Sequence, residues 1–188
     1  MSELTTCATL YALNARGGVR SAASTTTRLA SSSSAPPLVD IDCNFLHSDL
    51  PPFPLLLSHP STISANVEKF VSPSSSLAEY SKLKTHLDTG LYDNNIRTTV
   101  GIHPYSAPSE LNVEETDKFI RENLNSKFVS CVGECGLDFS DGFPPSSHQI
   151  PVFKLQVEIA VDTQTPLFIH TRLAHAETLE ILDSFGER

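Results

Sequence analysis

The sequence lacks long apolar runs and is poor in basic residues. No window approaches the roughly 18 uninterrupted apolar residues of a membrane-spanning helix, which excludes a membrane span. Lys and Arg number 13 against 22 Asp and Glu, for a formal net charge of -9. Such a surface repels a phosphate backbone and argues against a basic nucleic-acid-binding module. A nuclease that holds phosphate through metal ions is still compatible with it.

The cysteines show no CxxC spacing. There are four of them, Cys7, Cys43, Cys131 and Cys135, in a chain of 188 residues. The chain is neither small nor rich in cysteine, so this usage predicts reduced thiols in an intracellular protein. With 39% hydrophobic residues, the chain is long enough for one domain of ordinary size with a real core.

Residues 1–37 differ in composition from the remainder. They are rich in Ser, Thr and Ala, carry Arg16, Arg20 and Arg28, and contain a single acid, Glu3. This composition cannot build a packed core and is similar to mitochondrial or plastid transit peptides. A disordered tail without targeting function is the alternative, and it would leave the protein in the cytoplasm. Residues 38–188 retain 10 basic and 21 acidic residues, a net charge of -11.

From residue 38 onward, strand-like and helix-like segments alternate. The pattern predicts strands over 38–46, 67–73, 96–106, 127–139 and 165–172, with helices over 76–90, 112–125, 146–164 and 174–185. Strands separated by helices indicate parallel βαβ units and an α/β fold. Residues 48–62 contain four prolines and are expected to form a loop.

Polar side chains interrupt strands that should be apolar on both faces. With a side-chain period of two, the exceptions share one face or follow the strand end: Asp40, Asp42 and Asn44 in the first strand, His103 after the third, Glu134 and Asp138 in the fourth, and His170 and Arg172 in the fifth. In a barrel of parallel strands, catalytic residues gather at the C-terminal mouth. We therefore expect a functional site there.

The residue types at this mouth indicate a metal site. Carboxylates and imidazoles without inward thiols suit Mg²⁺, Mn²⁺ or Zn²⁺. Burying Glu134 in the middle of a strand is costly unless it is paired, and no Lys occupies these inward positions. A carboxylate can bridge two divalent ions, which would solve this problem for Glu134. The alternative is a structural ion pair between Glu134 and Arg172.

Three segments resemble signature segments of the TatD-type metal-dependent deoxyribonucleases. They are GIHPYSA (101–107), VGECGLDF (132–139) and TPLFIHTRLAHAETLEIL (165–182). Residues 39–50 and 67–83 are similar to that family's first strand and to its second strand with the following helix. The family belongs to the metal-dependent hydrolases with a TIM-type (β/α)8 barrel. The resemblance implies this fold, a site with two divalent metal ions as cofactors, and DNA as the substrate.

The resemblance also assigns roles to single positions. Glu134 matches the catalytic, metal-bridging glutamate, and His170 matches a metal-ligand histidine. His103 matches a histidine expected to meet the substrate phosphate, and Arg172 is expected to contact the substrate as well. The two first-strand histidines found in many members are replaced by Asp42 and Asn44, which we expect to act as oxygen ligands.

The chain contains fewer strands than the family's barrel. A complete barrel has eight strands and typically about 250 residues, whereas residues 38–188 supply about five βα units. We therefore expect the N-terminal part of a barrel, truncated at its C-terminus, with two open sheet edges and impaired nuclease activity. One alternative is a non-catalytic truncated gene product or partner-binding fragment. Another is a hydrolase for a different small ester or amide.

Overall fold

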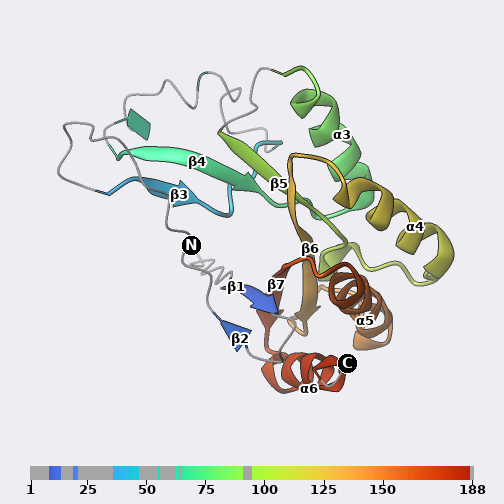
Figure 1. The fold of residues 1–188 in the computed structure, drawn as a ribbon. Helices are drawn as coiled ribbons and strands as arrows, with labels where there is room; N and C mark the ends of the chain where they lie inside the picture. The colour runs from blue at the N-terminus through green and yellow to red at the C-terminus, as the bar shows by residue number, and fades with distance from the viewer. Residues whose placement is uncertain are drawn as a thin grey trace.

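A curved, mainly parallel sheet with helices packed against it organises the chain. The computed structural model describes residues 9–13, 19–20, 36–46, 55, 62–63, 65–90 and 95–186. Five parallel strands follow one another in sequence order: β3 (Leu38–Asp40), β4 (Val67–Ser72), β5 (Ile96–Val100), β6 (Val129–Asp138) and β7 (Leu167–Arg172). They form a curled half-barrel (Figure 1), which confirms the predicted α/β fold of the TIM-barrel type.

Three helices connect successive strands from β4 to β7, and a fourth follows β7. They are α3 (Leu77–Leu87), α4 (Val113–Leu124), α5 (Ser146–Thr163) and α6 (His175–Phe185), and a short 3-10 turn, η1 (Pro104–Ser106), follows β5. Two helix starts are capped by side chains, because Ser76 accepts from the Glu79 N–H and Asn112 accepts from the Glu115 N–H. No helix in the described ranges is long and apolar enough to cross a membrane.

The main core lies between the sheet and the helices α4, α5 and α6. Val132 and Leu137 of β6 meet Phe153 and Ile159 of α5 in this cluster, and all four side chains are fully buried. Burial of such large apolar side chains is the main stabilising contribution to the fold. The core therefore fixes β6, the strand that carries Glu134 and Asp138, against α5.

Two glycines of β6 allow the close approach of β7. Gly133 and Gly136 both have φ +135, a conformation that L side chains rarely adopt. A Cβ atom at Gly136 would collide with the carbonyl oxygen of His170, and one at Gly133 would collide with that of Phe168. The glycines are thus required where the strand that carries Glu134 meets the strand that carries His170.

Two predicted strands are shorter than expected. The first ends at Asp40 and not at residue 46, because the Asp42 N–H bonds back to the Asp40 carboxylate and bends the chain. Cys43 still donates to the Val71 carbonyl, so the segment continues to follow β4. The third ends at Val100, and Pro104, which has no N–H for a ladder, begins η1.

The two edges of the sheet differ. Residues 1–37 contain two short strands, β1 (Thr9–Leu13) and β2 (Val19–Arg20), and β1 pairs antiparallel with β7. The sheet therefore continues past β7, and it still has two open edges among the described strands, at β2 and at β3. Whether residues 1–37 are a leader remains a prediction, and most of them lie outside the described ranges.

Candidate metal centre

Three side chains from neighbouring strands converge at the C-terminal edge of the sheet. His103 follows β5, Glu134 lies in β6 and His170 lies in β7. Each offers one potential ligand atom, and these atoms all lie within 4.8 Å of one another. The structure thus brings together three of the residues that the sequence singled out, from the face on which they were expected.

A bulge in β6 aims Glu134 into this cluster. Gly133 pairs with Phe168 and Cys135 with Ile169, so Glu134 is an extra residue in the ladder. Its N–H donates to the Ser74 carbonyl beyond β4 at 3.1 Å. Its side chain is largely buried, with Oε1 3.4 Å from His170 Nδ1 and 3.7 Å from His103 Nε2.

The alternative ion pair between Glu134 and Arg172 is not formed. Among the described residues, the two histidines are the ion-pairing partners of Glu134. Arg172 is exposed at the end of β7, and its backbone is in register with Asp138. The buried carboxylate therefore has no cationic side chain beside it other than an imidazole.

Asp138 orients the His170 ring. His170 Nε2 lies 2.8 Å from Asp138 Oδ2, and an ionised carboxylate only accepts hydrogen bonds, so Nε2 carries the proton. Nδ1 then faces Glu134 and is the nitrogen left for a metal ion. Histidines that bind metals commonly donate their second ring N–H to a carboxylate in this way. Asp138 was noted in the sequence only for sharing a face with Glu134, and that shared face was the signal of its role.

The pKa values of this pair reflect mutual stabilisation. Burial alone lowers the pKa of His170, but hydrogen bonds to Glu134 and Asp138 outweigh it and the pKa is raised. Burial alone raises the pKa of Asp138, but hydrogen bonds from Ser140 and His170 outweigh it and the pKa is lowered. Protonated His170 beside ionised Asp138 is thus favoured until a cation replaces the Nδ1 proton.

His103 is arranged as a hydrogen-bond donor. Its Nδ1 accepts the Tyr105 N–H at 3.2 Å, which leaves the ring proton on Nε2, the atom facing Glu134. Burial, reinforced by the charge of His170, lowers the pKa of His103 to about 4, against the opposing effects of Glu134 and Asp138. The ring is therefore neutral near pH 7. A neutral imidazole with its N–H at the site suits contact with an anion better than coordination of a metal.

Asp42 and Asn44 lie outside the three-residue cluster. Both are exposed beyond the end of β3. Partial burial, followed by the charges of Glu134 and Asp40, raises the pKa of Asp42, so its carboxylate lies close enough to sense Glu134. No contact joins Asn44 to the cluster in the part of the chain that the structure describes. Their roles as ligands remain predictions.

Two buried glutamines of α5 hold the backbone around the cluster. Gln149 Oε1 accepts from the Asp138 N–H at 2.8 Å, and Gln149 Nε2 donates to the Asp138 carbonyl at 2.7 Å. Gln156 does the same to Ile102, at 2.8 and 3.0 Å. The sequence analysis missed both residues. The available signal was a pair of amides seven positions apart, and therefore on one face of an otherwise apolar helix.

The donor set fits a divalent cation. The buried carboxylate of Glu134 and Nδ1 of the His170 imidazole face the same point, with a second imidazole, that of His103, beside them. Oxygen and nitrogen donors of this kind suit Zn²⁺ or Mn²⁺, and Mg²⁺ when water completes the coordination.

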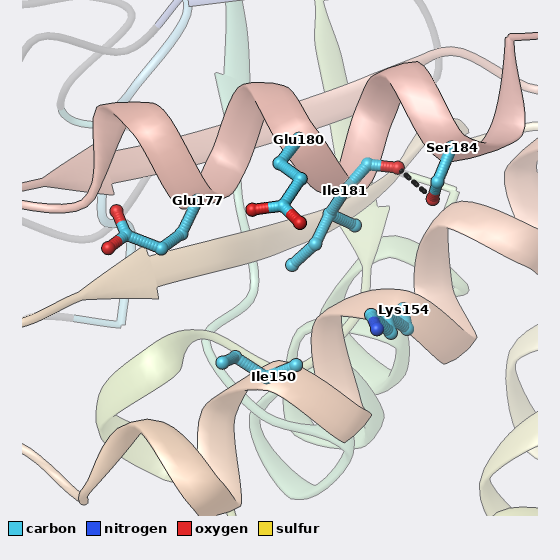
Figure 2. Close-up of a pocket in the computed structure, with 6 residues that line it drawn as sticks. All are labelled: Ile150, Lys154, Glu177, Glu180, Ile181 and Ser184. Carbon is cyan, nitrogen blue, oxygen red and sulfur yellow. Dashed lines mark hydrogen bonds between the residues drawn. The ribbon is translucent and has the colours of Figure 1, made fainter.

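A separate groove lies between α5 and α6, away from this cluster. Figure 2 shows its lining residues, Ile150 and Lys154 from α5 with Glu177, Glu180, Ile181 and Ser184 from α6. It contains a mixture of charges and none of the three clustered residues. We assign no role to it.

Comparison with known proteins matches this arrangement to one family. The family model described as TatD related DNase matches residues 58–188. The protein named 3'-5' ssDNA/RNA exonuclease TatD from Erwinia amylovora is 38% identical over 85 residues, which are 45% of this chain and 32% of that protein. The protein of the same name from Citrobacter koseri is 36% identical over 91 residues, 48% of this chain and 34% of that protein. The matched segment thus spans about a third of these relatives.

Solved structures share the fold. The TatD homologue YjjV from Escherichia coli K12 has a TM-score of 0.62 at 21% identity, over 78% of this chain and 55% of that one. The TatD family hydrolase from Entamoeba histolytica has a TM-score of 0.62 at 18% identity, over 82% of this chain and 56% of that one. Since the family model extends over most of the sequence, from before β4 to the last residue, this chain belongs to the TatD related DNase family.

Proposed function

We propose that the protein is a metal-dependent phosphodiesterase that acts on DNA. The observation that carries the proposal is a buried glutamate facing a histidine whose other nitrogen is bound by Asp138. This arrangement aims two donor atoms at one point, and no amine of the described residues pairs with them. Membership of the TatD related DNase family and the exonuclease names of the relatives support a nucleic-acid substrate.

In this proposal, each residue has a separate task. Glu134 and His170 Nδ1 hold the metal, and Asp42 and Asn44 add oxygen donors from the end of β3. A carboxylate has two oxygens, so Glu134 is able to serve two ions. A bound divalent ion supplies Lewis-acid polarisation of a phosphoryl oxygen and activation of water.

The phosphate is held by donors at the rim. His103 donates its Nε2–H to a phosphate oxygen, because its Nδ1 is occupied by the Tyr105 N–H. Arg172, exposed at the end of β7, offers a guanidinium for a charge-assisted contact with the phosphate backbone of the nucleic acid. The net charge of -9 supplies no long-range attraction, so binding depends on these local groups.

The test compares Glu134→Gln with the unmodified chain. Removing the hydrogen-bond partner of a metal ligand typically lowers metal affinity by roughly 10- to 100-fold. Glu134→Gln changes a ligand itself, so we expect it to lower the affinity for Mn²⁺ or Zn²⁺ by more than that. Calorimetry measures the affinity, and the release of nucleotides from end-labelled single-stranded DNA measures activity with Mn²⁺, Mg²⁺ or Zn²⁺. Glu180→Gln, on exposed helix α6, is the control.

Two outcomes would contradict the proposal. Unchanged metal affinity in Glu134→Gln would show that Glu134 does not bind the metal ion. Metal-dependent hydrolysis of p-nitrophenyl acetate with none of DNA would keep the centre and assign it to an ester substrate.

A further inference from the structure

We propose that Tyr105 and Phe143 form a stacking platform for a nucleobase of a single-stranded nucleic acid. The platform is defined as these two rings, which lie beside His103 at the mouth of the sheet. The proposal rests on the proposed function and adds the residues that would hold a base beside the phosphate.

The two rings come from different connections but meet at one place. Tyr105 lies in η1 after β5, and Phe143 lies in the connection between β6 and α5. Their centroids are 6.5 Å apart with planes at 71°, the edge-to-face geometry of aromatic pairs. The His103 ring lies 4.5 Å from Tyr105 and 6.3 Å from Phe143. An aromatic surface thus continues directly from the residue proposed to hold the phosphate.

Packing in the fold does not account for Tyr105. Its side chain is 53% exposed, although a tyrosine ring is among the largest apolar surfaces that a protein can bury. Its contacts with rings are those with His103 and Phe143, both at the site. An exposed ring next to a catalytic centre is better placed to contact a ligand than to stabilise the core.

The backbone holds the platform in place. The Tyr105 N–H donates to His103 Nδ1, and the Ser106 N–H donates to the His103 carbonyl at 2.8 Å. Next to Phe143, the Pro144 carbonyl accepts from buried Gln149 at 2.5 Å. Rings that are fixed before binding lose little conformational entropy when a base stacks on them.

The chemistry selects an unpaired base. In a chain with net charge -9, stacking offers affinity that does not depend on a positive surface. Every base has a π-face, so the contact tolerates any sequence. In a duplex, each base face is covered by its neighbours, and exposing one costs a few kcal/mol of unstacking. The platform therefore favours a single strand, with the base next to the phosphate that His103 contacts.

The absence of tryptophan gives a direct test. The chain contains none, so Tyr105→Trp creates a single reporter at the platform. It is titrated in EDTA, which prevents cleavage, with a short oligothymidylate and with an abasic oligomer carrying the same number of phosphates. We expect fluorescence quenching with the first and little with the second. Leu179→Trp, on an exposed position of α6 (60%), is the control and should respond to neither.

Affinity gives the second measurement. Binding of a labelled oligothymidylate should weaken about 5- to 30-fold in Tyr105→Ala, and Tyr105→Phe should retain it because stacking needs the ring and not the hydroxyl. Equal quenching by the abasic oligomer, or unchanged affinity in Tyr105→Ala, would overturn the platform while metal-dependent hydrolysis of DNA still stood. Failure of the unmodified chain to bind either oligomer in EDTA would overturn the platform alone, because the metal that the proposed function requires is absent from that titration.

Discussion

At the scale of single residues, the cluster depends on which ring nitrogen carries a proton. His170 has two nitrogens, and the sequence does not say which of them faces the site. The contact with Asp138 settles this, because it holds the proton on Nε2 and presents Nδ1 to Glu134. His103 has the opposite arrangement, with Nδ1 occupied by a backbone N–H and Nε2 left as the donor. Two histidines predicted from similar strand-end positions are thus prepared for different tasks.

Replacing Asp138 tests this orientation. We expect Asp138→Asn to lower affinity for Mn²⁺ or Zn²⁺ about 10- to 100-fold, because an amide neither fixes the His170 tautomer nor raises its basicity as a carboxylate does. Calorimetric titration measures the affinity, and a thermal melt checks that the fold is retained.

Asp141→Asn is the matched control for this change. Asp141 is an exposed acid three positions further along the same segment, so the substitution removes the same charge without touching His170. An equal loss of affinity in both variants would mean that Asp138 acts through charge alone and not through the ring.

At the scale of elements, the meeting of β6 and β7 sets the geometry of the cluster. We expect Gly136→Ala to destabilise the fold by about 2–4 kcal/mol, since the added Cβ meets the His170 carbonyl and the positive φ is strained. Denaturant unfolding measures the free energy. Gly142→Ala is the control, because Gly142 also has a positive φ, of +90, but no atom within 4 Å of its Cβ position.

The control separates strain from collision. Gly142→Ala should cost only the strain, about 1 kcal/mol. A similar cost in both variants would show that β7 moves away to accommodate the methyl group. In that case, metal affinity should change in Gly136→Ala, since His170 moves with its carbonyl.

The elements also show what sequence reasoning can and cannot reach. Alternating apolar segments and helix signals located β4, β6 and β7 closely, and also the start of β5, because burial on both faces of a parallel strand imposes a strong pattern. The bulge at Glu134 was not predicted, since a period of two assumes a regular ladder. The first strand was predicted too long because the bend at Asp42 depends on a local side-chain bond.

The site was predictable to a similar extent. Glu134, His103 and His170 stood out as polar groups in apolar surroundings, and they are the three that converge. Gln149 and Gln156 did not stand out, because an amide on a helix is most often solvated and only the packing shows these two to be buried. Their partners are backbone groups, which no sequence pattern marks.

At the scale of the whole molecule, β3 forms one open edge of the sheet. Leu38 and Val39 are 51% and 52% exposed, and β3 pairs only with β4 among the described strands. An apolar edge strand of this kind pairs readily with another chain. We expect the 188-residue chain to associate with itself as its concentration rises, as seen by sedimentation velocity.

Val39→Lys tests the edge. A charged side chain on an edge strand opposes pairing, so this variant should remain monomeric at concentrations where the unmodified chain associates. Leu179→Lys, which places the same charge on exposed helix α6, should leave the association unchanged. Loss of association in both variants would indicate a general charge effect, and no loss in Val39→Lys would place the contact elsewhere.

The spacing of Gln149 and Gln156 on helix α5 matches the spacing of the two backbone segments that they bind. The two buried amides stand seven residues apart, which on a helix is about 10.5 Å along the axis and nearly two full turns. Gln156 binds the backbone of Ile102, next to His103, and Gln149 binds the backbone of Asp138, whose carboxylate contacts His170. A single inserted residue between them would rotate one amide by about 100° and detach it from its strand. Substitutions along the outer face of α5 should therefore be tolerated, whereas an insertion or deletion between Gln149 and Gln156 should not.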